Sequence, residues 1–91
     1  MELKELYRLA EELDKKFTAE NLWCEIYADY NNKICFHINW GDWKHDHLRA
    51  DWVAREFFKA LGYTIDITTD VTEEDGSDTY SAVHIIRFKG C

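Results

Sequence analysis

The apolar positions of residues 2–20 recur at steps of three and four, the spacing of one face of an α-helix. The same spacing returns over residues 47–61 and predicts a second helix there. Asn21 and Gly62 stand where each helix is expected to end, and Asp46 is placed to cap the N-terminus of the second one. The predicted buried positions of the two helices are Leu3, Leu6, Ala10, Leu13 and Phe17, then Ala50, Val53, Ala54, Phe57, Phe58 and Leu61.

Apolar and polar residues alternate over residues 22–30, 34–40 and 63–71, which is the period of a half-buried β-strand. Residues 79–88 predict a fourth strand that is apolar on both faces. A strand of that kind usually lies in the interior of its sheet. The pattern of the fourth strand does not decide which of its two faces points to the core.

The sequence Tyr-Asn-Asn-Lys at residues 30–33 predicts a hairpin turn, because Asn tolerates positive φ. A two-residue Asn-Asn loop would place the apolar residues of the two flanking strands on opposite faces. A three-residue loop from Asn31 to Lys33 places them on one face. Since a one-residue slip moves every side chain to the other face, we favour the three-residue loop. Its expected pairs are Ala28 with Phe36, Ile26 with Ile38 and Cys24 with Trp40.

These elements give the order α-β-β-α-β-β, which predicts a single α+β domain over residues 1–91. We expect a four-stranded, mainly antiparallel sheet with both helices packed on one face. The same order arises when the first strand of the ferredoxin-like βαββαβ arrangement is moved to the C-terminus. In that arrangement the last strand would be central. The analogy concerns the fold and implies no function.

The composition supports one small core. Of 91 residues, 46% are hydrophobic and 15% aromatic, and the four glycines and lack of proline exclude collagen-like or linker sequences. Residues 1–5 are charged, so we expect no signal peptide, and no apolar run is long enough to cross a bilayer. Cys24, Cys35 and Cys91 lack a C-x-x-C spacing and favour free thiols in a reducing cytoplasm, with a Cys24–Cys35 disulfide as the alternative.

The histidines and cysteines raise the question of a metal or a catalytic site. Zinc needs four convergent donors, usually supplied as close pairs, and His45 with His47 is the one close pair. Cys35 and His37 share a strand face but stand about 6–7 Å apart along it. We therefore expect no catalytic residue, metal or cofactor. His45 and His47 are expected in an exposed loop, and His84 is expected either buried with a hydrogen bond or on the sheet surface.

The net charge of the chain is the most informative feature of the sequence for its function. The chain has 18 acidic and 11 basic residues, a net charge of −7. This excess of acids excludes the usual basic type of nucleic-acid-binding protein and argues against binding to an anionic membrane. Residues 63–91 hold six acids and two bases, and such an array can steer and hold a basic partner. Its alternative role is solubility alone. The acids are Asp66 and Asp70 on the outer face of the second hairpin, and Glu73, Glu74, Asp75 and Asp78 near its tip.

Three aromatic residues are candidate anchors for a partner. Trp23 and Tyr27 alternate away from the predicted core, and Trp43 lies in the short polar connection of residues 41–47. Exposed Trp and Tyr beside acids are typical of protein interfaces. Trp43 could equally fold back over an edge of the core.

A compact, acidic, proline-free chain without a catalytic motif resembles the small phage-encoded inhibitors of host defence, including anti-CRISPR proteins. The resemblance rests on size, charge and whole-chain character, and no motif carries family residues over. It implies a non-enzymatic DNA mimic in the cytoplasm of a bacterial host, which blocks the basic nucleic-acid-binding surface of a partner protein. The six acids of the second hairpin and the three aromatic anchors would form the partner-binding site. The alternatives are a homo-oligomeric module whose aromatic sheet face packs on a copy of itself, and a metal- or thiol-dependent enzyme.

Overall fold

A computed structural model describes residues 2–29, 31–38, 43–73 and 80–89. Its element order, α-β-β-α-β-β, confirms the predicted α+β class. The elements are α1 (Leu3–Ala19), β1 (Cys24–Asp29), β2 (Lys33–Ile38), α2 (Trp43–Ala60), β3 (Ile65–Glu73) and β4 (Tyr80–Phe88).

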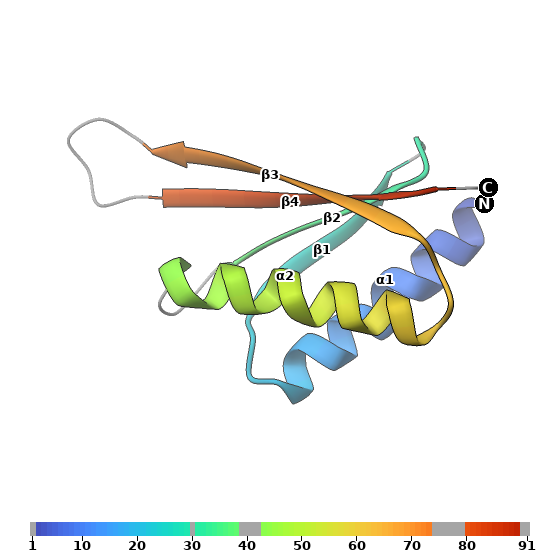
Figure 1. Ribbon diagram of the computed structural model, residues 1–91, viewed down its shortest axis with the longest axis horizontal. Helices are drawn as coiled ribbons and strands as arrows, with labels where there is room; N and C mark the ends of the chain where they lie inside the picture. The colour runs from blue at the N-terminus through green and yellow to red at the C-terminus, as the bar shows by residue number, and fades with distance from the viewer. Residues whose placement is uncertain (1, 30, 39–42, 74–79, 90–91) are drawn as a thin grey trace.

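The four strands form one antiparallel sheet in the order β1-β2-β4-β3, and both helices cover the same face of it (Figure 1). β4 lies between β2 and β3, as its apolar character on both faces predicted. This order is the one that the ferredoxin-like arrangement gives when its first strand is moved to the C-terminus. We call the sheet face turned away from the helices the open face.

The core fills the space between the helices and the sheet. Phe36 of β2 is fully buried there, and its ring lies 5.1 Å from that of Phe17 in α1. Each large apolar side chain buried in this way stabilises the fold by about 1.5–3 kcal/mol. The core consists of Leu6, Leu9, Ala10, Leu13 and Phe17 of α1, Leu22 just before β1, Ala50, Val53, Ala54 and Phe58 of α2, and Ile34, Phe36, Ile67, Ile86 and Phe88 of the sheet. Leu61, which the helical spacing predicted to be buried, is 52% exposed just after the end of α2.

Both helices end in the same hydrogen-bonded turn. Asn21 and Gly62 take positive φ angles of 63° and 86° directly after α1 and α2. The N–H of the next residue, Leu22 or Tyr63, donates to the carbonyl of Phe17 or Phe58 at 2.8 and 3.0 Å. This is the Schellman motif, which needs a residue that tolerates the left-handed conformation. The two predicted helix ends are confirmed.

The first hairpin has a three-residue loop, as expected, but one residue earlier than predicted. Asp29 pairs with Lys33, so the loop is residues 30–32 and not Asn31 to Lys33. Asn32 supplies the positive φ of 63°, and the Asp29 carboxylate accepts a hydrogen bond from the Asn31 N–H at 3.1 Å. The pairs are therefore Ala28 with Ile34, Ile26 with Phe36 and Cys24 with Ile38. The predicted pairs were wrong by two residues, a shift that leaves every side chain on its predicted face.

α2 begins four residues before the predicted start. The segment expected to be a loop is helical from Trp43 onward, and Asp46 lies within the first turn rather than at the N-cap. An acid there interacts favourably with the helix dipole. His45 and His47 are accordingly helical, which corrects their assignment to an exposed loop.

Candidate functional site

The open face of the sheet carries three of the predicted site residues, Tyr27, Asp66 and Asp70. Alternate residues of each strand point to it, and the antiparallel register aligns them into rows across the four strands. The two central strands present Cys35, Ile85 and Val83 together with the basic side chains Lys33 and Arg87, and acids lie along both outer strands. From β1 to β3 the rows are Asp29–Lys33–Arg87–Asp66, Tyr27–Cys35–Ile85–Thr68 and Glu25–His37–Val83–Asp70.

Trp23 directly precedes β1, and Tyr27 lies on this face at the β1 edge, where the alternation predicted it. Their side chains are 63% and 50% exposed, large values for residues of this size. Glu25 lies between them on the same face. Partial burial raises the pKa of the Tyr27 hydroxyl, and the neighbouring Cys35 raises it further. The two aromatic side chains therefore offer neutral, amphipathic contact area next to a carboxylate.

Asp66 and Asp70 lie at the opposite edge, on β3. Asp70 is exposed, Asp66 is half-buried, and Thr68 stands between them, so the two acids are about 13 Å apart along the strand. Asp66 is directly across from Arg87, whose Nη1 donates to the Thr68 hydroxyl at 2.9 Å. About 14 Å of sheet separates these acids from the aromatic edge, since three strand spacings lie between β1 and β3.

The other predicted site residues are not placed on this face by the described part of the structure. Trp43 is the first residue of α2, in the helix layer on the other side of the sheet, and its side chain lies outside the described part. Glu73 ends β3, with a side chain that is likewise not described. Glu74, Asp75 and Asp78 lie outside the described residues.

The thiols and the neighbouring imidazole do not form an activated pair. Cys35 and Cys24 are free and lie on opposite faces of the sheet, which corrects the disulfide alternative. Burial raises the pKa of the Cys35 thiol, an effect that a hydrogen bond from Tyr27 partly offsets. Burial, with Asp14 and Asp46 nearby, raises the pKa of Cys24 to about 12. A thiol needs the opposite shift to become a good nucleophile. His37 Nε2 contacts the Glu25 carboxylate at 2.9 Å.

His84 takes the first of its two predicted positions, buried on the helix side of the sheet. It is 1% exposed, its ring stacks on Phe36 with centroids 4.7 Å apart, and Nδ1 lies 3.0 Å from the Thr69 hydroxyl. From α2, the Asp51 carboxylate approaches Nδ1 at 3.5 Å and the His47 ring lies 5.5 Å away. The sequence pattern did not reveal this cluster, because Asp51 and His47 come from a helix whose packing against β4 is a tertiary contact.

Within the described residues, no three His, Cys, Asp or Glu side chains are grouped so that they could hold a metal ion. In the same part of the chain neither helix has the length and apolar character needed to span a bilayer.

We compared the chain with protein-family models, with curated proteins and with solved structures, and none of the three comparisons gave a match.

Proposed function

We propose that this protein is a non-enzymatic binding protein that occupies a basic, nucleic-acid-binding surface of a partner protein. The observation that carries the proposal is the pairing of two exposed aromatic side chains, Trp23 and Tyr27, with acids on one sheet face. Aromatic anchors supply desolvated contact area, and the acids steer a basic partner towards it.

The net charge of −7 supports the same partner class. A basic surface that normally binds phosphates meets a negative field here, which speeds association and weakens as salt is added. The resemblance to small phage-encoded inhibitors agrees with this proposal, since blocking such a surface needs no catalytic residue.

The test is affinity capture from a bacterial lysate followed by competition. Proteins retained by the wild-type bait are identified by mass spectrometry, and each is then bound to a labelled nucleic acid that the chain must displace. We expect the double variant Asp66→Lys, Asp70→Lys and the double variant Trp23→Ala, Tyr27→Ala to lose both capture and displacement.

Two matched controls distinguish binding at the open face from binding through net charge or nonspecific hydrophobic contact elsewhere on the protein. Trp52→Ala removes a Trp of α2 that is also 63% exposed, and Glu12→Lys with Glu56→Lys reverses two acids of the helix layer. Both controls should capture as the wild type does. Equal capture by the open-face variants would refute the proposal. A salt-insensitive dimer in light scattering at micromolar concentration would instead favour a homo-oligomeric module that buries the aromatic face.

A further inference from the structure

β1 is an edge strand with one described neighbour. It pairs with β2 along all six of its residues, and within the described part of the chain no strand lies on its other side. Half of the backbone N–H and C=O groups of such a strand point outward, and they are a template for another extended chain. β1 contains neither Pro nor Gly, so along its length of about 20 Å every residue has the backbone N–H that strand pairing needs.

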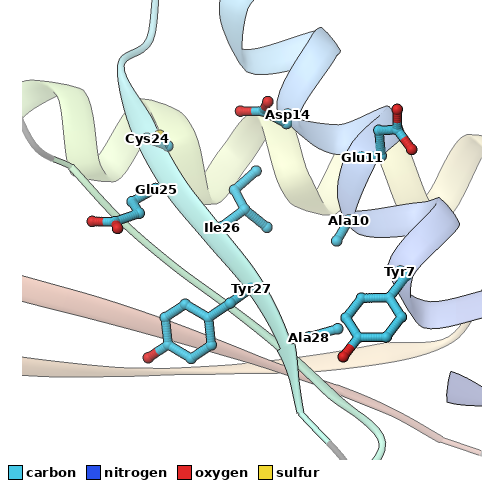
Figure 2. A pocket seen from close by; sticks show the side chains of 9 residues that line it. All are labelled: Tyr7, Ala10, Glu11, Asp14, Cys24, Glu25, Ile26, Tyr27 and Ala28. Atoms are coloured by element: carbon cyan, nitrogen blue, oxygen red, sulfur yellow. The ribbon is translucent and has the colours of Figure 1, made fainter.

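A hollow of about 590 Å³ follows this edge, between β1 and α1 (Figure 2). Residues of both faces of β1 line it, from Cys24 to Ala28, so it runs along the backbone edge of the strand rather than over one face. Its other wall is one flank of α1, formed by Tyr7, Ala10, Glu11 and Asp14 at helical spacing. We call this hollow the β1 groove. Its volume lies within the range of about 300–1,000 Å³ that is usual for ligand sites.

The negative charge of the β1 groove favours a basic ligand. Glu11, Asp14 and Glu25 line it, and its described lining residues include no Lys or Arg. Tyr7 of α1 and Tyr27 of β1, both about half exposed, lie near the Ala28 end of the groove, Tyr27 projecting from the side of β1 away from α1 (Figure 2). The faces of such rings attract cations. A second copy of this chain would bring its own Glu25 and Asp29 against these acids, and like charges placed together disfavour that pairing.

We propose that the β1 groove binds an extended, lysine- or arginine-rich protein segment as a fifth strand beside β1. Main-chain hydrogen bonds to the strand edge supply affinity, and alternate basic side chains reach the acids of α1. The groove shares Tyr27 and Glu25 with the open face, but the acids of α1, Glu11 and Asp14, belong to the groove alone. Variants of these two acids therefore test this proposal separately from the function proposed above.

The experiment uses a fluorescein-labelled heptapeptide of alternating lysine and valine, with binding read by fluorescence anisotropy at two salt concentrations. The control peptide carries proline at two adjacent central positions, one on each edge of the strand, and an extra lysine at one end that restores the net charge, so it cannot extend the sheet. The variant Glu11→Gln, Asp14→Asn removes two groove acids. Its matched control, Glu12→Gln, Glu56→Gln, removes two acids that do not line the groove.

We expect the groove variant to weaken peptide binding about fivefold, the loss of two solvent-exposed ion pairs, and the control variant to bind as the wild type does. The proline peptide should bind at least tenfold more weakly. The backbone amides of residues 24–29 should exchange more slowly with solvent when the alternating peptide is bound. Equal losses in the two variants, equal binding of the two peptides, or no binding would overturn the proposal. So would slow exchange at β1 in a dimer formed without peptide, which would identify a second copy as the occupant.

Discussion

Acid should destabilise this fold through His84. Burial lowers the pKa of His84 from its ordinary value of 6.5, although the Asp51 carboxylate opposes the shift and His47 and Arg55 reinforce it. We assign the ring proton to Nδ1, because that nitrogen faces the acceptor-only Asp51 carboxylate. Nε2 is buried with no hydrogen-bond partner among the described residues. Protonating it would create a buried, unsatisfied N–H, which explains the direction of the shift.

The sign and size of the effect follow from proton linkage. Below about pH 6.5 the unfolded chain binds a proton at His84 and the native chain does not, so the free energy of unfolding falls as the pH falls. The contribution of neutral His84 to the free energy of unfolding is fully present above pH 6.5. It is lost as the pH falls from 6.5 towards the pKa of His84 in the folded state. The maximum slope for one proton is about 1.4 kcal/mol per pH unit, which amounts to as much as about 2 kcal/mol between pH 6.5 and 5. That is a large share of a typical stability of about 5–15 kcal/mol.

The assay is urea unfolding between pH 7.5 and 5, monitored by far-ultraviolet circular dichroism. His84→Asn should be less stable at pH 7.5, because it loses the ring stacked on Phe36, but its stability should change less with pH. His37→Gln is the control, and it should keep the steep fall because His84 remains in place. A direct NMR titration of the His84 ring in the wild type needs no variant. Protonation of His84 above pH 6.5, or the same pH slope in His84→Asn, would refute the reasoning.

Three smaller predictions concern the core, a turn and a thiol. Phe36→Ala should cost about 3–5 kcal/mol in urea unfolding, because it empties the fully buried centre of the sheet; a loss below about 1 kcal/mol would contradict this. Gly62→Ala should cost about 1–2 kcal/mol through its φ of 86° alone, since nothing lies within 4 Å of the added Cβ; an unchanged melting temperature would argue against that conformation. Cys24, with its pKa raised to about 12, should react with a disulfide reagent at pH 8 far more slowly than free cysteine, as peptide mapping can measure; an equal rate would contradict its burial.

The fold followed from periodicity because each element buries one face. Alternation identified the inward residues of β1, and the left-handed Asn21 and Gly62 marked both helix ends. The sequence pattern did not predict the structure where two local structures satisfy the same pattern. Shifting the pairing register of the first hairpin by two residues leaves every side chain on the same face of the sheet. The burial of the apolar residues could therefore select the length of the loop but not its position. The start of α2 was missed because Asp46 suits an N-cap and a first turn equally well.

The candidate site was less predictable than the fold. Side-chain alternation placed Tyr27 on the open face correctly, and Trp23 is exposed, but the alternation could not show that Asp66 and Asp70 lie at the far edge of the same sheet. That distance depends on strand order, which the pairing of β2 with β4 determines. The α1 wall of the β1 groove was missed for a related reason. Glu11 and Asp14 read as an ordinary solvated helix flank until β1 is placed beside them.

The acidic residues gain a second role when the two sheet edges are considered together. Edge strands pair readily with copies of themselves, and proteins prevent this with short strands and charged side chains. Here β1 is six residues long and has Glu25 and Asp29 along it, whereas the longer β3 carries Asp66 and Asp70. Edge-to-edge pairing of two copies would therefore bring acid against acid, whichever edges met. A basic strand meets no such repulsion. The same negative charge that disfavours self-association is what the proposed basic partner would need at these edges. A charge that served solubility alone would not need to lie there.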